Sequence, residues 1–295
     1  MYIFASLKVH KILMITKKKI NMTKNSNKTG EMSFLEHLEE LRWHIVRSAI
    51  AILVFGTLAF IFSRFIFDYV LLAPKNPEFF TNRMLCLWAE KLNASNLCIN
   101  SVPLIIQNIK MAGQFSATIM VSLYTGLIIA FPFVVWEMWR FISPALYENE
   151  RKAARGSVGS ISMMFFIGAL FGYYVIVPLS IHFLGGWEAS KEITTQVDLE
   201  SYFSTISFIP FATGIIFELP ILMIFLTKAG IITPSFMIKY RKHAIIVLMI
   251  LAAIITPPDI FSMALVMLPL ILLYEISIIM TKRTARKHQQ TVSGA

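Results

Sequence analysis

Six long apolar segments, separated by polar ones, dominate the hydrophobicity pattern of this chain. They cover Ile45–Phe67, Phe115–Trp136, Gly156–Pro178, Phe203–Thr227, Ala244–Thr256 and Ile260–Met280. A helix of about 20 apolar residues is long enough to cross the hydrocarbon core of a bilayer. The segment Ala244–Thr256 is short for a span. At about 1.5 Å per residue it rises only about 20 Å, whereas the hydrocarbon core is about 30 Å thick. The pattern predicts an all-α membrane protein with six transmembrane helices.

An amphipathic helix is predicted directly before the first apolar segment. Ser33 and Glu36 have the spacing of a capping box, in which each side chain bonds the other residue's backbone N–H. The apolar residues that follow at helical spacing are Phe34, Leu38, Leu41 and Ile45. We expect this N-terminal helix to lie at the membrane surface and to lead into the first span.

The distribution of lysine and arginine predicts the orientation of the spans. Most basic residues fall in the N-terminal segment, in the loops after the second and fourth spans, and in the C-terminal tail. Cytoplasmic loops of membrane proteins carry such an excess of positive charge. We therefore predict a multi-pass protein of the bacterial inner membrane with both termini in the cytoplasm.

Composition supports this picture and excludes one class of partner. Of the 295 residues, 56% are hydrophobic and 15% are charged, whereas a soluble domain has about 25% charged residues. The net charge of +10 would suggest nucleic acid in a soluble protein. Here the basic loops fix the topology and contact anionic lipid. We expect membrane lipid as a partner, and no nucleic acid.

The chain is expected to form one membrane domain with two basic ends. Residues 1–31, rich in lysine and asparagine, are predicted to be a disordered extension, or to precede the start codon that is used. Met22 and Met32 offer such later starts. Residues 32–281 are assigned to the membrane domain, and residues 282–295 to a basic cytoplasmic tail.

The sequence patterns of soluble enzymes are absent from the chain. It contains no G-x-x-x-x-G-K-[ST], no G-x-G-x-x-G and no H-E-x-x-H, and its six histidines lack the spacing of metal ligands. Its serines and histidines do not group as a nucleophile and a base. We therefore predict a protein that is not an enzyme and that uses neither a cofactor nor a metal.

Acidic residues inside the apolar segments are the first candidates for function. Glu218 lies inside the fourth segment, where a charged side chain costs about 2.5–3.5 kcal/mol. It is either a structural, protonated side chain or a functional polar site, as in an ion-coupled transporter. Glu275 lies nearer a helix end, which favours a structural role. Glu137, close to two tryptophans, is interpreted as an interfacial residue.

Glu40 and Glu150 are a second pair of candidates, on the cytoplasmic side. Each belongs to a segment that flanks a predicted span. Two carboxylates near the inner membrane surface suit the recognition of guanidinium groups, which they bind bidentately. The alternative is that both are solvated glutamates paired with Arg42 and Arg151.

Both cysteines, Cys86 and Cys98, lie in the long outward loop 68–112. The bacterial periplasm is oxidising, so we predict a disulfide between them. A closed loop of about 12 residues is worth roughly 2–3 kcal/mol in the chain-entropy model. The alternative is two buried free thiols.

Four sequence blocks resemble those of a known family. They are His37-Leu-Glu-Glu-Leu-Arg42, Phe141-Ile-Ser-Pro-Ala-Leu-Tyr147 with Glu150-Arg151, Phe217-Glu-Leu-Pro220 and Thr256-Pro-Pro-Asp259. In order and spacing, from about Met32 to Thr281, they are similar to the TatC family, the multispanning core of the twin-arginine translocase. The resemblance implies a concave bundle of six helices with both ends inside.

The resemblance also implies a receptor. TatC proteins bind signal peptides with paired arginines on folded precursors. They recruit TatA-type subunits, and often TatB, into an oligomeric Tat complex that exports the cargo with the proton-motive force. Because the chain has no internal repeat, an ion-coupled small-solute transporter that uses Glu218 is the less supported alternative.

The residues of the family's sites can be matched one by one. Glu40 and Glu150 match the carboxylates that contact the arginine pair. The surrounding patch corresponds to Arg42, Phe141, Pro144 and Leu146. Glu218 matches an intramembrane polar residue associated with partner subunits. Two further residues, Pro74 and Asp259, match outward-side positions of the family.

Overall fold

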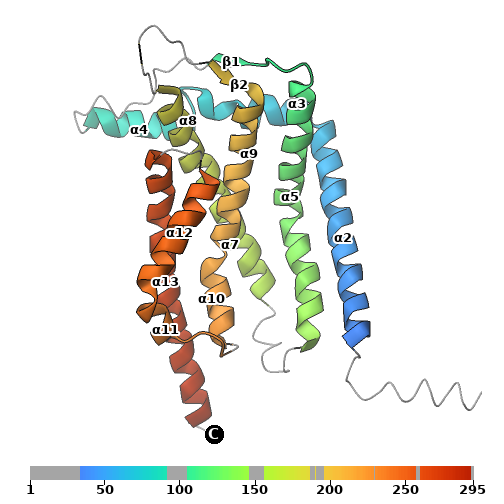
Figure 1. Ribbon diagram of the computed structural model, residues 1–295, viewed down its shortest axis with the longest axis vertical. Helices are drawn as coiled ribbons and strands as arrows, with labels where there is room; N and C mark the ends of the chain where they lie inside the picture. The colour runs from blue at the N-terminus through green and yellow to red at the C-terminus, as the bar shows by residue number, and fades with distance from the viewer. Residues whose placement is uncertain are drawn as a thin grey trace, which may run out of the picture. The chain divides into compact units, whose positions relative to one another are not determined.

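The structure is a computed structural model that describes residues 34–91, 105–145, 156–186, 190, 196–228, 230–256 and 260–293. The described chain is mostly α-helical (Figure 1). Its contacts divide it into two units, Met1–Ile45 and Val46–Ala295, and each is described by itself. The predicted disordered extension, residues 1–31, lies outside the described residues and stays a prediction.

The first helix, α2 (Phe34–Ile61), runs without a break through the predicted surface helix and the predicted first span. Its membrane-length apolar part begins at His37. No proline interrupts this stretch, so nothing in the sequence ends a helix near Ile45. A separate amphipathic surface helix is therefore not confirmed. The chain continues through α3 (Ser63–Phe65), the π-helical turn η2 (Ile66–Leu71) and the 3-10 turn η3 (Ala73–Lys75).

Helix α9 lies at the centre of the packing in the unit Val46–Ala295. The elements around it are α5 (Gly113–Ile142), α7 (Ser157–Phe171), η6 (Gly172–Ile176), α8 (Val177–Gly186), α9 (Leu199–Ile216) and α10 (Leu219–Lys228). Helix α9 packs against both α5 and α7 (Figure 1). Phe165, Ile206 and Ile209 are fully buried there. The ring of Phe165 stacks on that of Phe131 with 3.6 Å between centroids.

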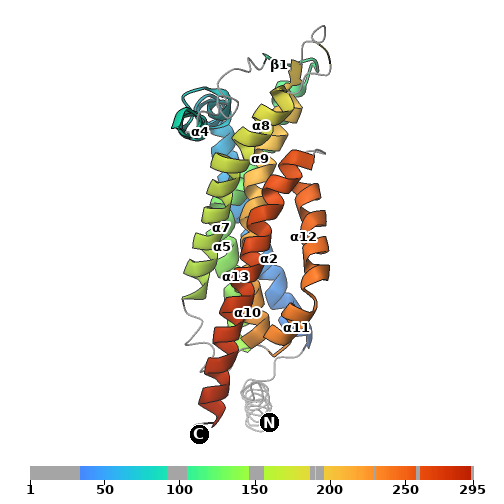
Figure 2. The same ribbon diagram turned by 90° about the vertical axis from the view of Figure 1, so that its left-hand side faces the viewer.

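The C-terminal helices join this group through α13. Their bounds are α11 (Pro234–Lys239), α12 (Arg241–Ile255) and α13 (Ile260–Ser293). Helix α13 packs against α10 and α12, as Figure 2 shows. The hydroxyl of Tyr274 donates a hydrogen bond of 2.9 Å to the carbonyl of Met237 in α11. Because α13 continues to Ser293, the predicted basic tail begins inside a helix.

Among the described residues, five segments are long and apolar enough to cross a membrane. They are His37–Ile61, Gly113–Ile142, Val158–Gly186, Leu199–Lys228 and Ser262–Ala285. The remaining predicted span, Ala244–Thr256, corresponds to α12, whose 15 residues rise about 22 Å. Tyr240 separates α12 from α11, so the preceding residues do not lengthen it. The count of six transmembrane helices is not confirmed and stays a prediction.

Two short strands were not expected from the all-α prediction. Strand β1 (Ile105–Gln107) pairs in parallel with β2 (Gln196–Asp198), with Ile105 opposite Gln196. Three residues are too few to show an alternating pattern, which is why the sequence does not reveal them. The pairing places the segment before α5 beside the segment before α9 (Figure 1).

Glycines allow close helix contacts at two places. A Cβ atom on Gly126 of α5 would lie 2.6 Å from the backbone nitrogen of Gly56 in α2 and 2.7 Å from its Cα. A Cβ atom on Gly168 of α7 would lie 2.6 Å from the Cβ of Phe217 and 2.8 Å from the carbonyl oxygen of Thr213. Small residues at such contacts are typical of helix packing in membranes. These glycines set how closely α2 approaches α5 and how closely α7 approaches α9.

Candidate functional site

The candidate arginine-binding carboxylate Glu40 lies on α2, in the first unit. Its side chain is half-buried, whereas that of Arg42 is exposed. The Arg42 guanidinium lies 5.9 Å from the ring centroid of Trp43. Residues two apart on a helix do not face each other. Helix geometry therefore disfavours the alternative in which Arg42 neutralises Glu40.

The other members of the predicted patch follow the end of α5. Phe141 is half-buried in the last turn of α5, and Pro144 is exposed in the 3-10 turn η5 (Ser143–Ala145). Leu146 and Glu150 lie outside the described residues. The meeting of Glu40 with Glu150 is therefore untested and stays a prediction.

Glu218 lies at a break in the fourth predicted span. Helix α9 ends at Ile216 and α10 begins at Leu219, so Phe217 and Glu218 form a turn between them. The backbone N–H of Glu218 donates to the carbonyl of Ile215 at 3.1 Å. Pro220, in the first turn of α10, has no N–H to continue the helix through this point. The expected continuous helix Phe203–Thr227 is thus two helices with a carboxylate at their junction.

One carboxylate oxygen of Glu218 is buried without a hydrogen-bond partner. The oxygen is Oε1, and the residue as a whole is half-buried. A buried polar atom of this kind is costly, since it has lost water and gained no bond in exchange. It marks the junction of α9 and α10 as a polar point inside an apolar span.

Glu137 is buried, which the interpretation as an interfacial residue did not anticipate. Its side chain is 2% exposed and forms ion pairs with two arginines. The Nη1 atom of Arg140, one turn later on α5, lies 3.4 Å from Oε1. The Nη1 atom of Arg47 on α2 lies 3.9 Å from Oε2. The sequence does not reveal this cluster, because Arg47 lies next to Glu137 only when α2 packs on α5.

The outward-side candidate Pro74 is buried at the turn η3. It is among the residues that are less than 2% exposed. Its carbonyl accepts a hydrogen bond of 3.2 Å from Nδ2 of Asn82, which also donates to the carbonyl of Asn76 at 2.9 Å. Pro74 therefore has a packing role in the region where η3 meets α4 (Phe80–Lys91). The other outward-side candidate, Asp259, lies outside the described residues.

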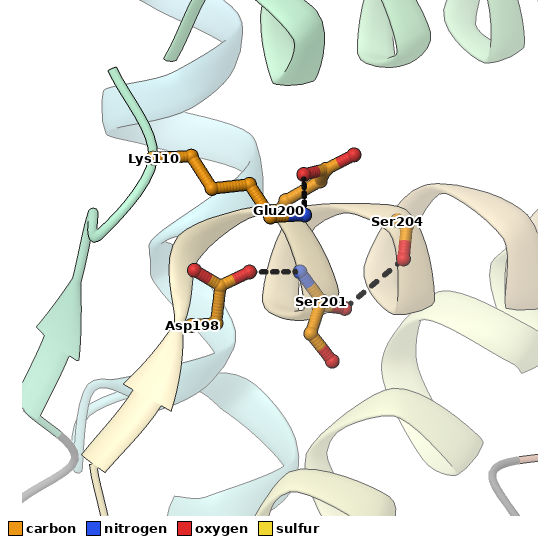
Figure 3. Close-up of polar contacts among 5 residues, drawn as sticks. All are labelled: Lys110, Asp198, Glu200, Ser201 and Ser204. Carbon is orange, nitrogen blue, oxygen red and sulfur yellow. Dashed lines mark hydrogen bonds and ion pairs between the residues drawn. The ribbon is translucent and has the colours of Figure 1, made fainter. Parts of the chain in front are cut away.

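An ion pair near the strands joins two segments that are far apart in the sequence. Lys110 Nζ lies 2.7 Å from Glu200 Oε2, in the first turn of α9 (Figure 3). The hydrogen bond to Glu200 and its negative charge raise the pKa of Lys110. Asp198 caps the same helix, because its carboxylate accepts a hydrogen bond of 3.3 Å from the N–H of Ser201. The ion pair between Lys110 and Glu200 joins the segment before α5 to the start of α9.

We expect Cys86 and Cys98 to form a disulfide. Cys86 is half-buried in α4, and Cys98 lies outside the described residues, so the pairing stays a prediction. Alkylation of the denatured, unreduced protein should label neither cysteine, and prior reduction should expose both. Cys86→Ser should lower the free energy of unfolding by roughly 2–3 kcal/mol. Labelling of both thiols without reduction would show that there is no bond.

Side chains of the types that ligate metals are scattered in the part of the chain that the structure describes. That part contains no group of three or more His, Cys, Asp or Glu side chains able to hold a metal ion. The five membrane-length apolar helices of the described residues define the class as a polytopic helical membrane protein.

Comparison with known proteins identifies the family within this class. The family model "Sec-independent protein translocase protein (TatC)" matches residues 36–269. This chain belongs to the TatC family. The resemblance read from the four sequence blocks is thereby confirmed. A translocase component has a transport role rather than a catalytic one, and the alternative of a small-solute transporter fits less well.

Individual relatives are similar to this chain over most of their length. TatC of Blattabacterium sp. subsp. Periplaneta americana is 38% identical, covering 88% of this chain and 99% of its own. TatC of Aquifex aeolicus is 34% identical, covering 88% of this chain and 98% of its own. A crystal structure described as the twin arginine translocase receptor TatC superposes with a TM-score of 0.67 at 33% identity. The superposition covers 84% of this chain and 99% of the chain in the crystal structure.

Proposed function

We propose that this protein is the signal-peptide receptor and core subunit of a twin-arginine translocase in a bacterial inner membrane. The family match over residues 36–269 carries the proposal, and the likeness to a structure described as a translocase receptor supports it. In this role the protein binds paired-arginine signal peptides of folded precursors. It recruits TatA-type subunits, often with TatB, into an oligomeric complex driven by the proton-motive force.

Glu40 and Glu150 are proposed to hold the two guanidinium groups of the signal peptide. A carboxylate binds a guanidinium through two parallel hydrogen bonds, and a hydrogen bond to a charged group contributes roughly 1.5–3 kcal/mol. Lysine cannot reproduce this planar fork, which accounts for a preference for arginine. The surrounding surface is assigned to Arg42, Phe141, Pro144 and Leu146.

Site-specific crosslinking tests the receptor role. A photoreactive amino acid at Glu39, exposed beside Glu40, should crosslink to a signal peptide with paired arginines in membrane vesicles. The same peptide with paired lysines should crosslink much less. A photoreactive residue at Trp88, exposed on α4, is the control and should give no crosslink. Equal yields with both peptides at Glu39 would contradict the proposal.

Helix α12 is proposed to be the sixth membrane crossing. Five crossings would put the two basic ends of the chain on opposite sides, whereas the positive-inside rule places both in the cytoplasm. An even number of crossings satisfies the rule. A helix of 15 residues can cross where the bilayer thins around it, or where Arg241 and Lys242 extend to the interface.

Glu218 is proposed to be a polar contact for a helix of a partner subunit. The break beside it and its buried, unpartnered Oε1 support this assignment. Glu218→Leu should reduce crosslinking of a TatA-type subunit to α10 by roughly fivefold, since one hydrogen bond is worth about 1 kcal/mol. Glu218→Gln should retain most of it, because the amide still forms hydrogen bonds.

Glu275→Leu is the matched control for this experiment. Glu275 is a second glutamate on a spanning helix, but Arg241 Nη2 already lies 2.9 Å from its Oε2. Its replacement should leave crosslinking to α10 unchanged. If Glu218→Leu also leaves crosslinking unchanged, Glu218 has a structural role only.

A further inference from the structure

We propose that Arg47 and Arg140 bind the phosphate group of an anionic phospholipid at the end of α5. The two guanidiniums flank one buried carboxylate, that of Glu137, and offer their outer sides to the membrane interface. This inference does not rest on the receptor role, because it concerns lipid binding by residues outside the proposed signal-peptide patch.

The geometry holds the two arginines together on one carboxylate. Each carboxylate oxygen of Glu137 faces a different guanidinium, at 3.4 Å for Arg140 and 3.9 Å for Arg47. Glu137 is 2% exposed, whereas the side chains of Arg47 and Arg140 are 50% and 48% exposed. A guanidinium has five N–H donors, so each arginine keeps donors on its exposed side. The buried glutamate thus positions two accessible guanidiniums side by side.

Among the three side chains Arg47, Glu137 and Arg140, positive charge exceeds negative charge. Two guanidiniums and one carboxylate carry a net charge of +1. At a second arginine–glutamate pair among the described residues, Arg241 and Glu275, one cation meets one anion at 2.9 Å and the two charges cancel. A phosphate diester with a single negative charge would balance the Arg47–Glu137–Arg140 cluster, and guanidinium forks match phosphate oxygens bidentately.

The position of the cluster along α5 places it where lipid phosphates lie. The 30 residues of α5 rise about 45 Å, which is the thickness of a bilayer with its headgroups. Arg140 is in the last turn of this helix, at one of the two headgroup layers. Trp136 is 45% exposed, and its ring centroid lies 5.1 Å from the Arg140 guanidinium. Tryptophan at this depth is typical of a membrane interface.

The packing of α2 on α5 explains why Arg47 reaches the same layer. The two helices run in opposite directions (Figure 1) and touch where Gly56 meets Gly126. From that contact, Arg47 is about 14 Å back along α2 and Glu137 about 17 Å forward along α5, at about 1.5 Å per residue. Both side chains therefore arrive at nearly the same height, on neighbouring helices.

Lipid titration of the full-length protein tests the proposal. The detergent-solubilised protein is titrated with phosphatidylglycerol, with phosphatidylcholine, or with inorganic phosphate, and its melting temperature is recorded. Phosphatidylglycerol should raise the melting temperature by about 5 °C near saturation, while the other two raise it little. Arg47→Gln and Arg140→Gln should each raise the Kd for phosphatidylglycerol roughly tenfold.

Arg241→Gln is the matched control, because it also removes one half-exposed arginine from a glutamate pair. Its Kd for phosphatidylglycerol should equal that of the unaltered protein. The proposal fails if Arg47→Gln and Arg140→Gln bind phosphatidylglycerol normally, or if Arg241→Gln weakens binding as much as they do. An equal response to inorganic phosphate would show a site for free anions instead of lipid.

Discussion

Replacing Glu40 or Glu150 with alanine is expected to weaken the capture of a twin-arginine signal peptide by roughly 10- to 100-fold. Each replacement removes the carboxylate that is proposed to bind one guanidinium, and a charge-assisted contact contributes roughly 1.5–3 kcal/mol. Lysine at either position should weaken capture further, because it places a positive charge against the arginines. The dissociation constant of a labelled signal peptide on proteoliposomes measures these effects.

The matched control is Glu39→Ala, which removes the same charge from the exposed position next to Glu40. It should bind the signal peptide normally, and all variants should insert into the membrane at wild-type levels. A double-mutant cycle tests the contact directly. If Glu40 contacts one arginine of the peptide, changing that arginine to lysine should weaken binding to the Glu40→Ala variant little further. Full export of folded cargo by both the alanine and the lysine variants would contradict the assignment.

The apolar pattern predicted the helices well, but it missed where they end. The second apolar segment was assigned to Phe115–Trp136, whereas α5 runs from Gly113 to Ile142. The pattern stops at Trp136 because Glu137 and Arg140 are charged. In the structure these two residues form an ion pair, and the helix continues through them to Ile142, just before Ser143 and Pro144. Hydropathy alone cannot predict such an extension, since it marks where the apolar residues stop, and charged residues such as Glu and Arg also form helices.

Packing between helices was the part that the sequence could not supply. Glu137 and Arg47 are far apart in the chain, and the packing of α2 on α5, where Gly56 meets Gly126, brings them to the same height. The break at Glu218 could be anticipated in part, because Pro220 lacks an N–H. The buried state of its Oε1 could not, because it depends on the neighbouring helices.

Gly126→Ala is expected to destabilise the protein, although alanine is the better helix former. Its Cβ would lie 2.6 Å from a backbone nitrogen and 2.7 Å from a backbone Cα of Gly56, so α2 and α5 must move apart. Overpacking of this kind costs roughly 1–3 kcal/mol. The melting temperature should fall by several degrees, since 1 kcal/mol corresponds to about 2–4 °C in a protein of comparable size. Gly126→Leu should be worse, because its longer side chain enters the same contact.

Gly159→Ala on α7 is the control that separates this clash from helix propensity. A Cβ atom there meets nothing within 4 Å, so alanine should be neutral or should stabilise the helix by up to about 1 kcal/mol. The two glycine-to-alanine changes should therefore shift the melting temperature in opposite directions, or at least by clearly different amounts. Because the same contact sets the height of Arg47, Gly126→Ala should also weaken phosphatidylglycerol binding, and Gly159→Ala should not. Equal stability of the two variants would mean that α2 does not approach α5 through Gly56 and Gly126.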